Sequence, residues 1–181
     1  MDKTKKLILT ALMAAITCIG TMIIKVPTPT NGYIHPGDGF VLLSGLLLGP
    51  IYGSLAAGIG SALSDLISGY FVYVPATFII KAATALVACL IFSGITKLLA
   101  KQKQTAAKDM VALITAGIFG ETVMVLGYFI FEIFMLAIAN QTSIQAGIIS
   151  AIAGVIPNII QAVFGIIIAT VLHPILKKLI S

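Results

Sequence analysis

The stretch that decides the fold is DGFVLLSGLLLGP, residues 38–50, followed from residue 51 by IYGSLAAGIG. Residues 38–48 and residues 51–70 are both apolar, and Gly49-Pro50 separates them. Glycine next to proline is typical of a turn. If the chain reverses there, the two segments are separate helices; if it does not, they form one kinked helix. The choice sets the number of apolar helices at six or five.

The composition indicates that the solvent of this chain is lipid. Of its 181 residues, 59% are hydrophobic and 9% are charged, whereas soluble proteins carry about 25% charged residues. A hydrocarbon layer of about 30 Å needs roughly 20 apolar residues per crossing helix. The apolar segments are residues 6–24, 38–48, 51–70, 74–97, 110–139 and 146–176. With short connections they occupy the whole of residues 1–181, so we predict a single transmembrane domain.

The positions of the lysines favour six crossings over five. Lysines beside membrane-crossing helices concentrate on the cytoplasmic side. With a turn at Gly49-Pro50, six crossings put all three lysine clusters on that side; without it, the clusters fall on opposite sides. The clusters are Lys3, Lys5 and Lys6; Lys97, Lys101, Lys103 and Lys108; and Lys177 and Lys178. We therefore predict an all-α integral membrane bundle of six transmembrane helices, with both termini and a Lys-rich loop at about 98–109 in the cytoplasm.

One connection on the outer side is long. Residues 25–37, KVPTPTNGYIHPG, are rich in proline, glycine and asparagine. This composition is typical of an irregular loop. We expect it to lie as a lid over the outer end of the bundle.

Several ionisable side chains fall inside the apolar segments, where each costs about 2.5–3.5 kcal/mol at mid-depth. They are Asp65, Lys81, Glu121 and Glu132, with Asp38 at a segment boundary. Glu121, Tyr128 and Glu132 are spaced by seven and four residues, so on a helix they share one face. That face should point into the bundle rather than into lipid.

The six-helix topology gathers these groups in the outward half of the bundle. Asn158 and Gln161, three residues apart, add a polar face on the last helix. We expect a pocket for a small polar molecule under the lid. Two alternatives stay open: Lys81 pairs with Glu132 or Asp65 and fixes helix register, or Asp38 caps the second helix.

Several functions are excluded or disfavoured by the sequence. It has no G-x-x-x-x-G-K-[ST] motif, so the chain does not hydrolyse ATP by itself. It has no Ser/His/Asp or Cys/His constellation, and His35 and His173 are isolated, which argues against a metal site. The lysines flank the helices rather than forming one basic stripe, which argues against nucleic acid as a partner.

The order and spacing of these residues resemble the substrate-binding S components of energy-coupling factor (ECF) transporters, along nearly the whole chain. Within that family the chain is most similar to members assigned to hydroxymethylpyrimidine or pyridoxine-type compounds. The matching positions are Ile34-His35-Pro36-Gly37-Asp38, Leu46-Leu47-Leu48-Gly49-Pro50, Ser64-Asp65-Leu66-Ile67-Ser68-Gly69-Tyr70, Lys81, Gly120-Glu121, Gly127-Tyr128-Phe129, Glu132, Pro157-Asn158 and Gln161.

The resemblance implies a multi-pass subunit of the bacterial cell membrane that binds a vitamin with high affinity for ATP-driven uptake, and not an enzyme. Its partners would be a transmembrane coupling subunit and two cytoplasmic ATPases, which bind ATP and Mg²⁺; this chain itself would carry no cofactor. The AxxxA pair Ala11 and Ala15 would contact the coupling subunit. Residues 25–37 would gate the pocket.

The expected ligand is a small heteroaromatic vitamin or precursor. Tyrosine rings such as Tyr33 and Tyr128 stack on such rings, and Glu121 or Glu132 can accept hydrogen bonds from amino or hydroxymethyl groups. Lys81 favours a phenolate-like oxygen and hence pyridoxine, and the absence of Trp disfavours a ring system as large as riboflavin. The full set of candidate ligand-binding residues is Tyr33, His35, Asp38, Lys81, Glu121, Tyr128, Glu132, Asn158 and Gln161.

Two other classes of function remain open at this stage. A small secondary transporter would also use intramembrane glutamates, but it would move its substrate without ATPases. A membrane assembly factor would bind no small molecule.

Overall fold

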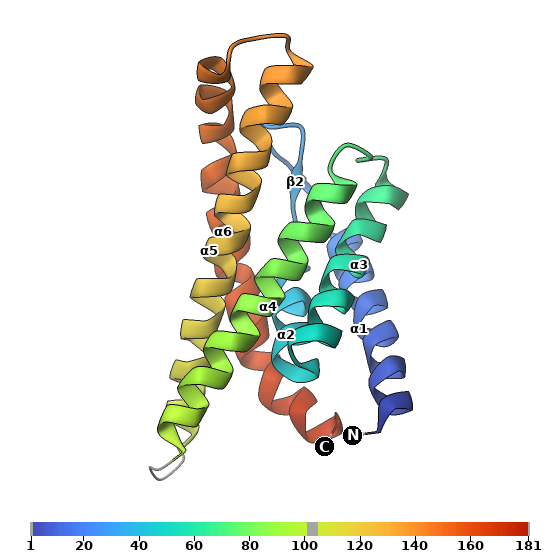
Figure 1. Cartoon of the computed structure of the whole chain (residues 1–181), viewed down its shortest axis with the longest axis vertical. Helices are drawn as coiled ribbons and strands as arrows, with labels where there is room; N and C mark the ends of the chain where they lie inside the picture. The colour runs from blue at the N-terminus through green and yellow to red at the C-terminus, as the bar shows by residue number, and fades with distance from the viewer. Residues whose placement is uncertain (1, 101–104, 181) are drawn as a thin grey trace.

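A computed structural model describes residues 2–100 and 105–180. In these ranges the chain forms six helices and one short hairpin (Figure 1). The elements are α1 (Lys3–Ile23), β1 (Val26–Pro27), β2 (Tyr33–Ile34), α2 (Asp38–Leu48), α3 (Pro50–Ser68), α4 (Val74–Leu99), α5 (Ala106–Ala139) and α6 (Ile144–Ile180).

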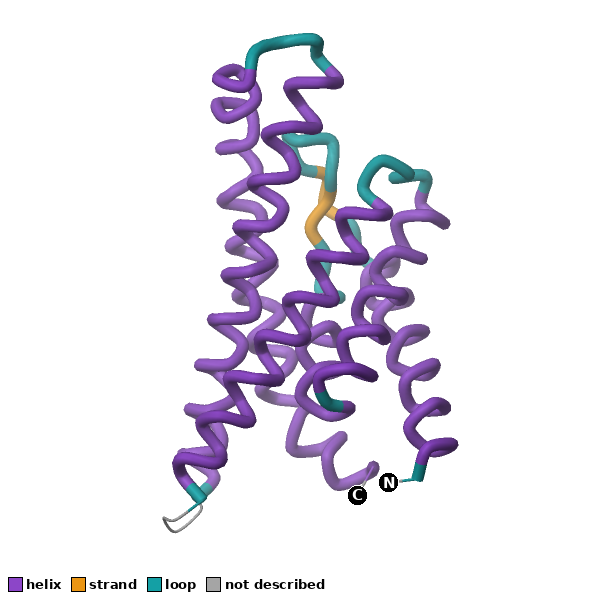
Figure 2. The backbone as a smooth tube through the Cα atoms, in the orientation of Figure 1, coloured by secondary structure: helices purple, strands orange, loops and turns teal. Residues whose placement is uncertain are grey.

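The chain reverses at Gly49-Pro50, as predicted. Gly49 has a φ of 85°, a conformation that glycine adopts without steric cost. Its N–H donates to the carbonyl of Gly45 and closes α2, while Pro50 opens α3, where a missing N–H costs nothing. The tight turn folds α3 back beside α2 (Figure 2).

The reversal puts the connections at two opposite ends of the bundle. The N- and C-termini lie at one end, which we call the terminal end, together with the α2–α3 turn, the end of α4 and the start of α5 (Figure 1). The hairpin and the α3–α4 and α5–α6 connections lie at the other end, which we call the loop end. All three lysine clusters, so far as their residues are described, therefore share one end, as the six-helix prediction requires.

Among the described residues, four helices are long and apolar enough to cross a membrane: α1, α4, α5 and α6. The shorter α2 is apolar but has 11 residues. Most of it is buried, and it contacts α1, α3, α4 and α6.

Small residues let the helices approach closely. On α3, Gly53 and Gly60 lie against the backbone of α2 and α1, at Ser44 and Ala14. A stripe of small residues on α6 is buried as well, from Gly147 to Ala169. Close approach of this kind stabilises helix pairs in lipid, where the hydrophobic effect adds little. The small residues of α3 and α6 thus serve internal packing.

Gly45 of α2 provides a test of this packing. A Cβ added there would lie 2.2 Å from the carbonyl oxygen of Ala85 on α4. Because the obstacle is backbone, Gly45→Ala should destabilise the protein by about 1–3 kcal/mol, measured as thermal unfolding in detergent. Gly94→Ala on the same helix as Ala85 is the control, because its Cβ would meet nothing within 4 Å. Equal unfolding temperatures for the two variants would contradict the close α2–α4 contact.

The segment predicted as an irregular loop contains a small hairpin. Val26 pairs with Ile34, and Pro27 pairs with Tyr33. Asn31, at the tip, has a φ of 61°, which asparagine tolerates better than most residues. The hairpin lies at the loop end, between the α5–α6 pair and the tips of α3 and α4 (Figure 2). We call residues 25–37 the lid.

Candidate functional site

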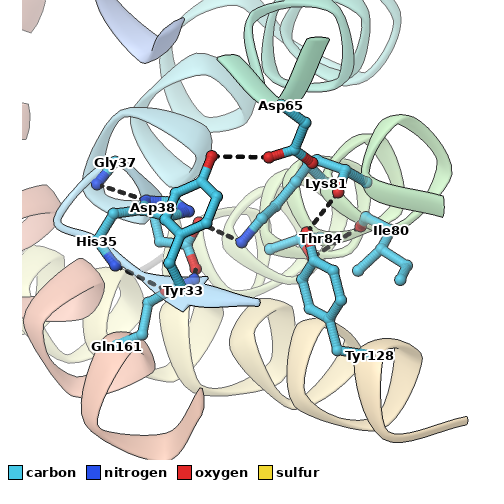
Figure 3. Close-up of polar contacts among 11 residues, drawn as sticks. Tyr33, His35, Gly37, Asp38, Asp65, Ile80, Lys81, Thr84, Tyr128 and Gln161 are labelled. Atoms are coloured by element: carbon cyan, nitrogen blue, oxygen red, sulfur yellow. Dashed lines mark hydrogen bonds and ion pairs between the residues drawn. The ribbon is translucent and has the colours of Figure 1, made fainter. Parts of the chain in front are cut away.

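An ion pair between α4 and α2 lies at the base of the site. Lys81 Nζ is 2.5 Å from Asp38 Oδ1, and both side chains are 0% exposed. The second oxygen of Asp38 accepts a hydrogen bond from Gln161 Nε2 on α6, at 2.7 Å. A buried charge is tolerated when it is paired and its remaining oxygens are hydrogen-bonded. The pair with Gln161 therefore joins α2, α4 and α6 (Figure 3).

Both alternatives that the sequence left open are wrong, because Lys81 and Asp38 have other partners than those expected. Lys81 pairs with Asp38, and not with Glu132 or Asp65. Asp38 is the first residue of α2, but no side-chain hydrogen bond caps that helix. Its carboxylate points at Lys81 and Gln161 instead. The register of the helices is thus fixed through a pair that the sequence did not single out.

The same network continues into the lid through Gln161. Its side-chain oxygen accepts from the backbone N–H of His35 at 2.9 Å, and His35 Nδ1 accepts from the N–H of Gly37 at 3.1 Å. Burial lowers the pKa of His35 to about 3, so the imidazole is neutral at pH 7 and Nδ1 is free to accept. The C-terminal end of the lid is therefore tied to the ion pair below it (Figure 3).

Tyr33 ties the lid to α3. Its hydroxyl donates to Asp65 Oδ1 at 2.7 Å and lies 3.2 Å from Ser64 Oγ. Burial, followed by the nearby Asp65 charge, raises the pKa of the Tyr33 phenol above its usual range. The Lys25 ammonium lies over the Tyr33 ring, 4.9 Å from its centre, and also contacts Ser68 of α3.

A third set of contacts ties the lid to α5 and to the start of α4. Thr30 donates to Glu132 Oε1 at 2.8 Å, and its carbonyl accepts from the hydroxyl of Tyr73 at 2.7 Å. The other oxygen of Glu132 has no hydrogen-bond partner within residues 2–100 and 105–180. One carboxylate oxygen of Glu132 is therefore available to accept a hydrogen bond from a ligand.

A hollow lies directly under the lid. Its cavity volume is about 30 Å³. Hydroxyls, amides, two carboxylates and four tyrosine rings line it: Thr21, Thr28, Gly32, Tyr33, His35, Ser61, Asp65, Tyr70, Tyr73, Thr77, Tyr128, Glu132, Asn158 and Gln161. Ligand pockets typically span about 300–1,000 Å³, so the hollow in this conformation is much smaller than a ligand pocket. The side chains fill most of the hollow, so a ligand the size of a vitamin requires the lid to lift or the tyrosines to turn.

Six of the nine candidate ligand-binding residues lie on the wall of this hollow: Tyr33, His35, Tyr128, Glu132, Asn158 and Gln161. The other three do not line it. Asp38 and Lys81 are buried beneath it, with Lys81 Nζ 5.1 Å from the centre of the Tyr128 ring. Glu121 is buried on the same face of α5 as Tyr128 and Glu132, as predicted, but it borders a separate groove between α5 and α6.

Eight further residues line the hollow but are not among the nine candidates: Thr21, Thr28, Gly32, Ser61, Asp65, Tyr70, Tyr73 and Thr77. Tyr70 and Tyr73 flank the α3–α4 connection, and their proximity to Asp65 in the sequence was a usable signal. Thr21 and Ser61 gave none, because isolated hydroxyls on apolar helices are common. Among residues 2–100 and 105–180, no group of three or more His, Cys, Asp or Glu side chains is placed to hold a metal ion.

A protein-family model described as "ECF-type riboflavin transporter, S component" matches residues 1–178. The chain belongs to this family. It is thus a multi-pass membrane protein and a substrate-binding S component, a class of subunit that works with an ECF module of coupling and ATPase subunits. The relation expected from the residues around the lid is confirmed at the level of the family.

Other proteins resemble this S component over 90% or more of its length. A Pyrococcus woesei protein described as "uncharacterized protein in gap 3'region" is 32% identical over 164 residues, covering 90% of this chain and 95% of its own. A solved S component of a bacterial ECF transporter superposes with a TM-score of 0.64 at 22% identity, over 99% of both chains. The biotin S component of an ECF-type ABC transporter gives 0.56 at 19% identity, over 96% of this chain and 95% of that one. These two structures support the fold.

Proposed function

We propose that this S component binds a small heteroaromatic vitamin or vitamin precursor of the pyridoxine or hydroxymethylpyrimidine type, for ATP-driven uptake into the cell. The observation that carries the proposal is the hollow under the lid, with Tyr33, Tyr70, Tyr73 and Tyr128 on its walls. Aromatic side chains stack on flat rings. The unpartnered oxygen of Glu132 supplies an acceptor for an amino or hydroxyl group of the ligand.

Riboflavin is the second candidate, and the description of the matching family model favours it. The narrowness of the hollow favours the smaller ring, because a three-ring ligand would displace more of the wall. A titration of the purified protein with pyridoxine, hydroxymethylpyrimidine and riboflavin separates the two. We expect one of the single-ring compounds to bind most tightly; riboflavin binding more tightly than both would reverse the choice.

We also propose that α1–α6 all cross the membrane and that the terminal end faces the cytoplasm. The lysines gathered at that end support this orientation. The lid and the hollow then face the outside, where an imported substrate arrives. To check the orientation, single cysteines are placed in the lid and near the C-terminus. Their reaction with an impermeant thiol reagent on intact cells then shows which of the two ends faces the outside.

We propose that the exposed face of α1 contacts the coupling subunit. Ala11 and Ala15 are exposed on this helix, between the exposed apolar side chains Ile8, Leu12 and Ile19. Two small residues four apart leave a shallow strip against which another membrane helix packs closely. This strip fits the coupling subunit of an ECF module.

Replacing Ala15 by tryptophan should separate binding from transport. We expect Ala15→Trp to reduce uptake at least tenfold in proteoliposomes that contain the coupling subunit and ATPases, because the indole blocks close helix contact. Ligand binding to the isolated subunit should be unchanged. Ile156→Trp, on the exposed face of α6, is the control and should preserve both. Wild-type uptake in the absence of ATPases would instead indicate a stand-alone secondary transporter.

A further inference from the structure

Two hydroxyl groups on the wall of the hollow depart from the pattern seen elsewhere in the helices. Seven serine and threonine hydroxyls in the described helices donate to a carbonyl four residues earlier, which satisfies them within their own helix. The residues that do so are Thr10, Ser44, Ser54, Thr84, Thr96, Thr122 and Ser150. Thr21 on α1 and Ser61 on α3 do not. Neither hydroxyl has a hydrogen-bond partner among the described residues.

Both hydroxyls are enclosed by protein. Thr21 is 1% exposed and Ser61 is 0% exposed, and both side chains line the hollow. Thr21 Oγ1 lies where the lid meets α2, since a Cβ added to Gly37 would approach it to 2.2 Å. The two side chains come from α1 and α3, whereas Glu132 comes from α5.

A buried hydroxyl without a partner destabilises the folded protein, because it has lost its hydrogen bonds to water. The cost is removed when a ligand supplies the missing partner. A ligand hydroxyl suits either position, since a hydroxyl can both donate and accept a hydrogen bond. An apolar ligand group would leave both unpaired, and a site of this kind discriminates strongly against it.

We propose that Thr21 and Ser61 form a subsite that recognises a hydroxyl-bearing side arm of the substrate, while the tyrosines hold its ring. The inference rests on the proposed function, because it concerns the same hollow. It narrows the substrate class to heteroaromatic compounds with at least one hydroxyalkyl arm. It also assigns a role in specificity to α1 and α3.

The test compares hydroxylated compounds with analogues that lack the hydroxyl group. The pairs are pyridoxine with its deoxy analogue, hydroxymethylpyrimidine with the corresponding methylpyrimidine, and riboflavin with lumiflavin, which lacks the ribityl arm. Each is titrated against purified wild type, Thr21→Val, Ser61→Ala and Thr17→Val. Thr17 is the matched control: its hydroxyl on α1 is also buried and unpartnered, but it does not line the hollow.

We expect Thr21→Val and Ser61→Ala each to weaken binding of the hydroxylated compound by about tenfold, and to leave binding of its analogue unchanged. Thr17→Val should change neither affinity. All three variants should unfold at the wild-type temperature or above it, because each loses an unsatisfied buried group.

The outcomes distinguish the subsite from the function. If wild type binds one of the hydroxylated compounds but the variants weaken it and its analogue equally, or weaken neither, the subsite is overturned and the proposed function stands. If wild type binds none of the compounds, the proposed function and the subsite both fail. A lower unfolding temperature for Thr21→Val would show that its hydroxyl is paired in the folded protein, which also overturns the subsite.

Discussion

Replacing Lys81 by methionine should destabilise the protein by about 3–5 kcal/mol, the usual cost of removing one partner from a buried ion pair. Methionine fills a similar volume, so the effect comes from charge rather than from a cavity. Asp38 would be left buried without its counter-ion, with Gln161 as its remaining partner among the described residues. The change in stability is measured by heating the protein in detergent and monitoring the loss of the monomeric form.

The loss of Lys81 should also release the lid, because Asp38, Gln161 and His35 form a continuous chain of contacts from the ion pair to the backbone of the lid. We therefore expect ligand binding by Lys81→Met to fall below detection. The double variant Lys81→Met with Asp38→Asn removes both charges and should recover most of the stability. Lys178→Met, on the exposed terminal end, is the control. A single variant as stable as wild type would show that the pair does not hold the helices together.

Replacing Glu132 by alanine should weaken ligand binding by at least a hundredfold. One oxygen of this carboxylate holds Thr30 of the lid, and the other is unpartnered within the described chain. Alanine removes a carboxyl acceptor on the wall and a tie to the lid at once, and each buried partner left without its hydrogen bond costs about 1–3 kcal/mol. Titration calorimetry on purified protein measures the change.

Two further variants separate these contributions. Glu132→Gln keeps the shape and an oxygen that can accept from Thr30, so it should lose less affinity than Glu132→Ala. Asn158→Ala should also weaken binding, since Asn158 lines the same hollow. Glu121→Gln is the matched control on the same helix, because Glu121 is buried but does not border the hollow. Undiminished affinity in Glu132→Ala and Asn158→Ala would remove both residues from the site.

The sequence was sufficient for the parts of the fold that depend on periodicity and charge. Gly49-Pro50 with the lysine clusters predicted the reversal between α2 and α3. The spacing of Glu121, Tyr128 and Glu132 predicted a face of α5 that points inward. Both follow from rules that act along one helix or across one membrane, so a single chain reveals them without knowledge of which helices touch.

The partners of the buried charges could not be predicted in the same way. The expected topology places three carboxylates near Lys81, those of Asp38, Asp65 and Glu132. Which of them pairs with Lys81 depends on how the helices are rotated and tilted. The structure resolves it because α2 is short and buried, which brings its first residue, Asp38, opposite Lys81. The sequence predicted the length of that helix but not its angle.

The hydroxyls of Thr21 and Ser61 were missed for a different reason. Threonine and serine in apolar helices normally bond back to their own helix, so their presence predicts nothing about a ligand. They become informative when the structure shows that the back-bond is absent and that both line the hollow.

The central claim is that the polar groups under the lid form a binding site for one small vitamin-type molecule. It is tested most directly by identifying, by mass spectrometry, the compound that co-purifies with the wild-type protein, and by titrating that compound back. We predict a single heteroaromatic compound, bound at one molecule per chain and absent from purified Glu132→Ala. If no compound is recovered and no B-vitamin or precursor binds, or if the compound also co-purifies at full occupancy with Glu132→Ala, the claim is contradicted.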